Sequence, residues 1–208
     1  MRKSLTVRST NGLCPFIWEL LELNMQSDEC LKILLQKGYK ITRPDVVAIA
    51  RGRIGVSKYK HAQDPAAAPG LVDCATFVRW VYSHLGIWLP RFSIQQSELG
   101  WPIELGNHKI GDLIFSQGYY GKYWVEGSDK IGHVGLVSSS NTVIHAAGTR
   151  LGVIESTLEY FCEAKKKFRG IRRICNISQT PILKVRPGRL VETVDDLRWD
   201  ILNTFGRG

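Results

Sequence analysis

The segment GLVDCATFVRW, residues 70–80, carries the strongest helix signal in the chain and places a cysteine directly after an acidic residue. Asp73 is a favourable N-cap residue and Gly86 is a typical helix stop, so a helix is predicted over residues 73–85. Its buried face, at helical spacing, holds Cys74, Val78, Val81 and Leu85. A cysteine in the first turn can be core filler, a metal ligand, half of a disulfide or a nucleophile.

The composition is that of one globular domain with additional flanking elements. The chain has 208 residues, of which 44% are hydrophobic, and this suffices for one well-buried core. No stretch approaches the roughly 18 uncharged apolar residues that a membrane-spanning helix needs. Pro15, Glu19 and Glu22 interrupt the first apolar run, so no signal peptide is predicted. We expect a cytoplasmic protein, or one exported by a route that needs no signal peptide.

Cysteine and charge patterns narrow the class of protein further. The five cysteines are scattered without a CxxC pair, which argues against a disulfide framework or a zinc ribbon and favours reduced thiols. The formal net charge of +9 favours anionic partners without naming one. The densest basic run, KKKFRGIRR at residues 165–173, is interpreted as a solvated edge strand. No nucleic-acid-binding motif accompanies it, so no nucleic-acid partner is expected.

The predicted elements run from helices to strands, which is typical of an α+β fold. Helices are expected within residues 1–40, over 45–53, over 73–85, and from Val194 to Phe205 with a stop at Gly206. Strands are expected at DLIFS (112–116), HVGLVS (133–138), TVIHA (142–146), GVIES (152–156) and FRGIRRI (168–174). We therefore predict a helical extension over residues 1–43, a central domain over 44–175 and a C-terminal extension over 176–208.

The position of Cys74 favours a reactive thiol. A helix N-terminus carries roughly half a positive charge and free N–H groups. A thiolate placed there has a pKa below its usual value of about 8.5. The sequence therefore predicts a lowered pKa for Cys74, whereas an inert buried cysteine would more naturally lie in mid-helix.

Two histidines have the spacing of a base and of a group that orients it. In a hairpin with its loop at residues 138–140, residue 137 pairs with 141, 135 with 143, and His133 with His145. Cross-strand neighbours have Cβ atoms about 5 Å apart, so one ring could orient the other. From spacing alone, catalysis, a Cys/His/His zinc site and coincidence all stay open.

Taken together, these segments resemble the NlpC/P60 family of cysteine peptidases. LVDCATFVRWVYSHLGIWLPRFSIQQ (71–96) resembles the family's nucleophile helix and its Leu-Pro-Arg-x-Ser-x-x-Gln stretch. IGDLIF (110–115) resembles its Pro-Gly-Asp-Leu-Val-Phe strand, and HVGLVSSSNTVIHAA (133–147) its pair of histidine strands. ARGRIGVSKYKHA (50–62) is a looser match to its Gly-x-Pro-Tyr segment. The likeness covers about residues 45–175, with the motifs in the family's order.

The resemblance implies a papain-like NlpC/P60 fold, in which N-terminal helices and the catalytic helix pack on an antiparallel β-sheet. It implies that Cys74 attacks a peptide carbonyl, that His133 is the base and that His145 orients His133. The implied substrate is the peptidoglycan stem peptide (a muropeptide), cut between γ-D-glutamate and the diamino acid, with no metal and no cofactor. The substrate-binding residues that it implies are Tyr59, Asp73, Ala75, Thr76 and Arg91.

The chain departs from the family pattern after the nucleophile, and it carries a loop before His133 that is longer than a hairpin needs. Ala75 and Thr76 replace the usual Ser-Gly pair after the nucleophile. Loop 116–132 carries four large aromatic residues among glycines: Tyr119, Tyr120, Tyr123 and Trp124. We interpret this loop either as a small packed cluster or as an aromatic wall of the substrate cleft. The alternatives to a muropeptide hydrolase are a papain-like amidase or acyltransferase with another substrate, a binding module without catalysis, and a basic protein that binds nucleic acid or another anionic surface.

Overall fold

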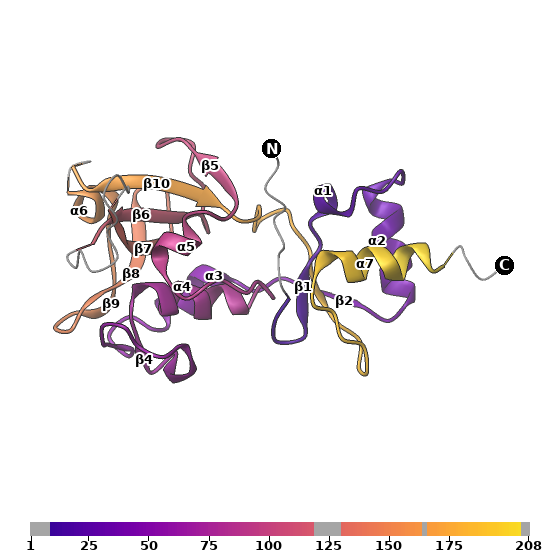
Figure 1. Cartoon of the computed structure of the whole chain (residues 1–208), viewed down its shortest axis with the longest axis horizontal. Helices are drawn as coiled ribbons and strands as arrows, with labels where there is room; N and C mark the ends of the chain where they lie inside the picture. Colours follow the sequence, from indigo (N-terminus) through magenta and orange to yellow (C-terminus); the bar gives the residue numbers. More distant parts are fainter. Residues whose placement is uncertain (1–8, 119–129, 164–165, 205–208) are drawn as a thin grey trace. The chain divides into compact units, whose positions relative to one another are not determined.

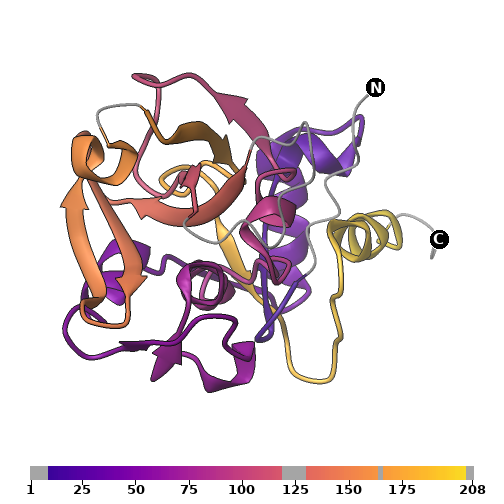
Figure 2. The ribbon, with the colours of Figure 1, turned by 60° about the vertical axis from the view of Figure 1, so that its left-hand side comes forward.

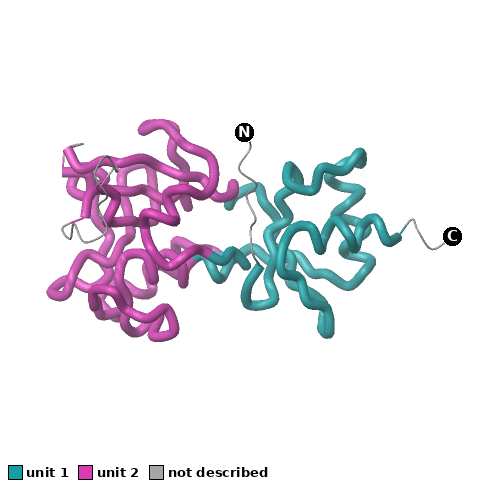
Figure 3. The backbone as a smooth tube through the Cα atoms, in the orientation of Figure 1, with its two compact units in different colours: residues 1–44, 82–88, 177–208 teal, residues 45–81, 89–176 magenta. Residues whose placement is uncertain are grey.

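The computed structural model describes residues 9–118, 130–163 and 166–204 (Figure 1). The chain forms two compact units, drawn in different colours in Figure 3. Unit 1 combines residues 1–44, 82–88 and 177–208, and unit 2 combines residues 45–81 and 89–176. Segments from both ends of the sequence therefore belong to one unit, and every predicted site residue belongs to the other.

Unit 2 is built on a six-stranded sheet whose neighbouring strands are antiparallel throughout the described residues. The spatial order is β5 (Trp101–Ile103), β10 (Phe168–Arg173), β6 (Leu113–Gln117), β7 (Ile131–Val137), β8 (Thr142–Gly148) and β9 (Gly152–Thr157). Continuous apolar runs such as Leu113, Ile114 and Phe115 are buried, as expected for strands covered on both faces. The α+β class with an antiparallel sheet is confirmed.

Short elements surround this sheet. They are α3 (Val46–Arg51), β3 (Lys58–Tyr59), a 3₁₀ turn (Pro65–Ala67), β4 (Leu71–Val72), α5 (Ser93–Gln96) and α6 (Leu158–Cys162). Asp45 begins α3, because its carboxylate accepts hydrogen bonds from the backbone N–H groups of Val47 and Ala48. The helix predicted over residues 45–53 is therefore present, and it ends two residues early at Arg51.

Helix α4 (Cys74–Ser83) corresponds to the helix predicted from the opening motif, and it lies beside the sheet (Figure 2). The predicted stop at Gly86 is confirmed, because this residue has a φ of 71°. A Cβ at Gly86 would also lie 2.2 Å from the carbonyl oxygen of Leu13, so glycine is required there by space as well as by conformation.

The interpretation of the basic run as an edge strand is wrong. β10 is paired on both sides, with β5 and with β6. The short strand β5, which carries little β signal of its own, forms the edge instead. Several of the basic side chains are used inside the unit: Arg173 forms an ion pair with buried Asp112, and Arg172 Nε donates to the carbonyl oxygen of Ser97.

Unit 1 contains a three-stranded antiparallel sheet in the order β1 (Leu13–Pro15), β11 (Ile182–Lys184), β2 (Lys40–Thr42). Its helices are α1 (Trp18–Leu21), α2 (Ser27–Gln36) and α7 (Val194–Leu202). Residues 1–40 were expected to be helical, so β1 and the start of β2 correct that prediction. The last helix ends at Leu202, before the predicted stop, which lies outside the described residues. Within the described residues, every helix is too short or too polar to span a membrane.

Candidate active site

Cys74 is the first residue of α4, and Asp73 caps that helix. Asp73 Oδ1 accepts from the backbone N–H of Thr76 at 2.8 Å, and the Asp73 N–H donates to Thr76 Oγ1 at 2.8 Å. The Phe77 N–H donates to the Asp73 carbonyl at 2.9 Å, which is the first bond of the helix. The predicted N-cap is confirmed, and the Cys74 N–H is one of the first-turn donors that have no partner within the helix.

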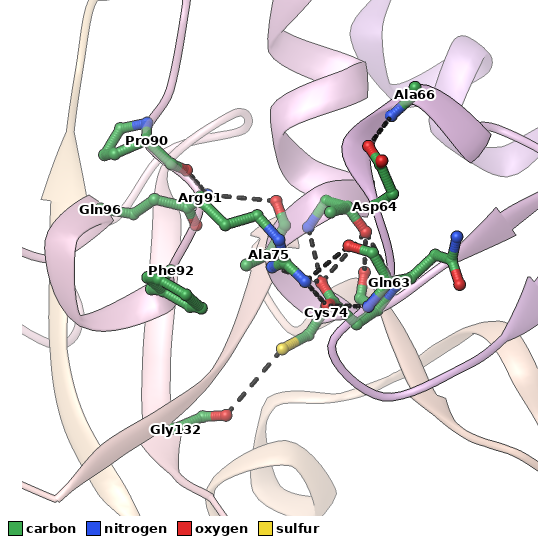
Figure 4. Close-up of polar contacts among 12 residues, drawn as sticks. Gln63, Asp64, Ala66, Cys74, Ala75, Pro90, Arg91, Phe92, Gln96 and Gly132 are labelled. Atoms are coloured by element: carbon green, nitrogen blue, oxygen red, sulfur yellow. Dashed lines mark hydrogen bonds and ion pairs between the residues drawn. The ribbon is translucent and has the colours of Figure 1, made fainter. Parts of the chain in front are cut away.

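The Cys74 side chain is 8% exposed, and its Sγ lies 3.9 Å from the carbonyl oxygen of Gly132 in β7 (Figure 4). Burial raises the pKa of the thiol to about 12, and the charge of Asp73 adds to the rise. The backbone N–H groups of Val134 and Ala75 oppose it, with less effect. The predicted lowering of the Cys74 pKa is therefore wrong for this buried site, because desolvation outweighs the helix N-terminus.

The hairpin between β7 and β8 has a different register from the predicted one. Leu136 lies opposite Ile144 and Val137 opposite Val143, so the loop is residues 139–141 and every pair is shifted by two. A shift of two residues leaves each side chain on its original face of the sheet, because successive side chains alternate between faces.

The two histidines are therefore still neighbours on adjacent strands, but they lie diagonally to each other instead of directly opposite. In the observed register His145 is level with Gly135, and His133 is one diagonal step away. His133 Nε2 and His145 Nδ1 are 2.8 Å apart, a hydrogen-bond distance between imidazoles. The prediction that the two rings lie together on one face is confirmed.

Phe161 and Gly135 hold the imidazoles in place. The Phe161 ring, from α6, stacks on His133 at 5.1 Å between centroids and meets His145 edge-on at 4.9 Å. At Gly135, a Cβ would lie 2.3 Å from Val143 Cγ1, 3.0 Å from Phe161 and 3.2 Å from the Cβ of His145. The absence of a side chain at residue 135 therefore makes the room that this ring cluster occupies.

Both imidazoles are neutral at neutral pH. Burial lowers the pKa of His133 to about 4, with Asp73 opposing the shift and Lys167 adding to it. Burial, helped by His133, lowers the pKa of His145 to about 3. A neutral imidazole has one bare nitrogen that can accept a proton, which is the state a general base requires.

These side chains line a cavity of about 800 Å³ that lies within unit 2. The predicted site residues on its wall are Tyr59, Asp73, Cys74, Ala75, Arg91, His133 and His145. Thr76, which was also predicted to contact substrate, is not on the wall. It is 1% exposed, and its hydroxyl is bonded to Asp73.

Asp73, which is buried, forms an ion pair with the half-buried Arg91 at the cavity wall. One oxygen of the carboxylate accepts from Thr76, and the other accepts from Arg91 and from the backbone N–H of Gln63. Arg91 also donates to the carbonyl oxygen of Gln63 at 2.6 Å. The carboxylate is thus largely saturated by donors from the protein, which fixes the first turn of α4 against the loop that carries Arg91.

Sequence reasoning missed two contributors to the site. Gln96 ends the segment 71–96 that resembles the family, and no role was predicted for it from the sequence. Its amide donates to the carbonyl oxygens of Ala75 and Pro90 and so joins α4 to the loop that carries Arg91. Helix α6 was not predicted, although it supplies Tyr160 and Phe161 to the cavity wall. A usable signal was Thr157, which precedes an apolar run and caps α6 through its hydroxyl.

The aromatic residues Tyr119, Tyr120, Tyr123 and Trp124, interpreted as a packed cluster or a substrate wall, lie outside the described residues. Residues 118 and 131–133, at the two ends of that loop, do line the cavity. Among the residues that the structure describes, there is no group of three or more His, Cys, Asp or Glu residues that could hold a metal ion.

Comparisons with known proteins agree on one family. The model of the NlpC/P60 family matches residues 56–173. A probable endopeptidase of Corynebacterium glutamicum is 32% identical over 115 residues, covering 55% of this chain and 48% of the relative. The murein DD-endopeptidase/murein LD-carboxypeptidase of Escherichia coli is 32% identical over 111 residues, covering 51% and 52%. The gamma-DL-glutamyl hydrolase of Bacillus subtilis is 30% identical over 136 residues, covering 64% and 30%.

Solved structures show the same fold. The crystal structure of an NlpC/P60 family protein from Bacillus cereus ATCC 10987 matches with a TM-score of 0.54 and 26% identity, covering 66% of this chain and 42% of the other. The chain spans about half the length of the first curated relatives it matches. Because the family model covers more than half of this chain and includes the cysteine and both histidines, the chain belongs to the NlpC/P60 family.

Proposed function

We propose that this protein is a cysteine peptidase that hydrolyses amide bonds in the stem peptides of peptidoglycan. The observation that carries the proposal is the meeting of Cys74, His133 and His145 at one cavity, with the two imidazoles 2.8 Å apart. A buried thiol beside a neutral base that is itself oriented by a third group is the arrangement of nucleophilic catalysis. The E. coli relative, by its name a murein endopeptidase, supports the choice of substrate.

In the acylation half-reaction Cys74 is the nucleophile and His133 the base. His133 Nε2 is occupied by His145, which leaves Nδ1 to take the thiol proton as Sγ attacks the carbonyl carbon. The new C–S bond places the electron pair of the carbonyl on its oxygen, and the Cys74 N–H at the start of α4 is a suitable donor to that oxyanion. The C–N bond then breaks, and the amine leaves with the proton from His133, so a thioester remains.

Deacylation uses the same groups in reverse roles. His133 takes a proton from a water molecule as its oxygen attacks the thioester carbon. The C–S bond breaks, Sγ regains the proton from His133, and the product is a carboxylic acid. His145 accepts the hydrogen bond from His133 Nε2 throughout and stabilises each imidazolium that forms.

We also propose cleavage between γ-D-glutamate and the diamino acid, with Tyr59, Asp73, Ala75 and Arg91 facing the substrate from the cavity wall. Thr76 then acts indirectly, by holding Asp73. Relatives named for a DD-endopeptidase, an LD-carboxypeptidase and a γ-glutamyl hydrolase show that the family cuts more than one bond. Because donors from the protein already occupy the carboxylate of Asp73, its role is to hold Arg91 in position on the cavity wall.

The test is digestion of purified sacculi and of defined muropeptides, with mass analysis of the products. We expect a new γ-D-glutamate terminus on the fragment that carries L-alanine and release of a peptide that begins with the diamino acid, with neither product from Cys74→Ala. Products from cleavage of a different stem-peptide bond would support the peptidase activity and contradict the proposed bond specificity. Complete inertness toward every wall substrate, with the protein folded, would reject the proposal in favour of another substrate or a binding module.

A further inference from the structure

A third strand extends the row of polar side chains that begins at the two histidines. In the β8–β9 pairing His145 lies opposite Ile154, so Ser156 is its diagonal neighbour on the same face of the sheet. His145 Nε2 and Ser156 Oγ are 3.0 Å apart. The row His133, His145, Ser156 therefore crosses β7, β8 and β9 along one diagonal, and both contacts between its members are at hydrogen-bond distance.

We propose that Ser156 is a positioning residue, whose hydroxyl supports the tautomer of His145 that carries its proton on Nε2 and through it the tautomer of His133. The Ser156 hydroxyl accepts a hydrogen bond from His145 Nε2–H. His145 Nδ1 is then bare and accepts from His133 Nε2–H. His133 Nδ1 is bare in turn, and it is the nitrogen that takes the thiol proton. The inference rests on the proposed function, because it assigns a helper to the same base.

The alternative tautomer shows why the hydroxyl matters. Without an acceptor at residue 156, a proton on His145 Nε2 would be a buried donor without a partner, since His145 is only 4% exposed. An unpaired buried N–H costs about 1–3 kcal/mol, and buried donors without a partner are rarer in proteins than under-satisfied acceptors. The proton would then move to Nδ1 and point at His133 Nε2, which would have to be bare. His133 would carry its own proton on Nδ1, and the base would be lost.

Within the described part of the chain, the contacts of the His145 ring nitrogens are those to His133 and Ser156. Phe161 covers both imidazoles with a hydrocarbon ring. The charged groups that act on His133 are Asp73, before α4, and Lys167, between α6 and β10. Among the residues that the structure describes, the charge effect at His145 comes from His133. The tautomer of His145 is therefore set by its two direct neighbours in the row.

The variants that test this are Ser156→Ala, which removes the hydroxyl, and Ser156→Thr, which keeps it. Ser138→Ala is the matched control, because Ser138 is also a serine of this sheet region whose hydroxyl is bonded, to Glu155, away from the histidines. At pH 7 we expect Ser156→Ala to lower kcat on muropeptides on the order of ten- to a hundredfold with little change in KM. Ser156→Thr and Ser138→Ala should stay within about threefold of the unsubstituted protein.

A second readout keeps this proposal separate from the proposed function. Nitrogen-15 NMR of the imidazoles reports which ring nitrogen carries the proton, without any substrate. We expect His145 protonated on Nε2 in the unsubstituted protein and on Nδ1 in Ser156→Ala. If wall substrates are not cleaved, the NMR result and the rate of iodoacetamide labelling at Cys74 still decide the role of Ser156. Equal losses in Ser156→Ala and Ser138→Ala, or His145 bare at Nε2 in the unsubstituted protein, would overturn it.

Discussion

At Cys74 two physical effects act in opposite directions on the thiol. The N-terminus of α4 favours the thiolate, whereas burial in the cavity wall and the charge of Asp73 favour the neutral form. The sequence displays the first effect, since it depends only on helix position. The charge of Asp73 is also visible in the sequence, but the burial depends on neighbours such as Gly132 in β7, which are distant in the sequence, so it could not be predicted.

This balance predicts slow thiolate chemistry in the protein without substrate. Iodoacetamide should label Cys74 with a pH midpoint above the usual 8.5, because the buried thiol gives up its proton only at high pH. The measurement is labelling rate against pH, followed by mass spectrometry of the Cys74 peptide. A midpoint clearly below 8.5 would show instead that a thiolate–imidazolium pair with His133 already exists in the resting protein.

The two histidines should differ in their sensitivity to substitution. His133→Ala removes the proposed base, and we expect kcat to fall by about a thousandfold or more. His145→Asn keeps an oxygen that can accept from His133 Nε2–H, so a loss of roughly 10- to 100-fold is expected. Steady-state kinetics on a defined muropeptide would measure both, with unfolding curves as the control for folding. Equal and total loss in the two variants would contradict the assignment.

Burial of His133 predicts an unusual acid limb in the pH profile. His133 must be neutral to accept the thiol proton, and its pKa is lowered to about 4. The acid limb of kcat/KM should therefore lie near pH 4, well below the ordinary histidine value of about 6.5. The free energy of unfolding should also decrease as pH falls from 6.5 toward 4, because the unfolded chain binds a proton that the folded state excludes. An acid limb at or above 6.5 would refute this.

At the scale of elements, the alternation of side chains along a strand predicted the site more reliably than the expected strand register did. The prediction that His133 and His145 share a face survived a shift of two residues, because the side-chain period of a strand is two. The register depended on the loop, whose serines and asparagine do not specify its length. The position of β10 could not be predicted for a similar reason: only the fold shows that β5 pairs with its outer edge.

Gly135 offers a direct test of the hairpin geometry. Gly135→Ala places a methyl group against Val143, Phe161 and His145, so we expect destabilisation of about 1–3 kcal/mol from overpacking. We also expect lower kcat, since the His145 ring must move. Gly70→Ala is the matched control, because a Cβ there meets only one atom, at 3.8 Å. Denaturant unfolding and kinetics measure the two effects, and a Gly135→Ala variant indistinguishable from Gly70→Ala would contradict the packing.

At the scale of the whole molecule, the main surprise is that both flanking segments of the sequence build one unit. β11, from near the C-terminus, lies between β1 and β2, from the first 42 residues. The sequence shows an extended stretch and an amphipathic helix after residue 176, but strand pairing across such a separation leaves no local signal. The segments that carry the family motifs are largely local in sequence, and their arrangement was correspondingly easier to predict.

A buried polar cluster holds unit 1 together and predicts how it unfolds. Asp200 in α7 accepts from the Tyr39 hydroxyl and from Arg189 Nε. Asp200→Ala leaves the buried Tyr39 hydroxyl without its acceptor, which costs about 1–3 kcal/mol, and it removes one of the two carboxylates that pair with Arg189. We expect amide hydrogen exchange to rise in α2, α7 and the β1–β11–β2 sheet.

The control is Asp195→Ala, because Asp195 is an exposed acid on the same helix. It should change exchange rates little, since exposed substitutions are usually within about 0.5 kcal/mol. Each unit has its own buried residues, so the rise in Asp200→Ala should be larger in unit 1 than in strands β6, β7 and β8 of unit 2. An equal rise in both units would show that they unfold as a single cooperative body, and that the division into two units has no thermodynamic counterpart.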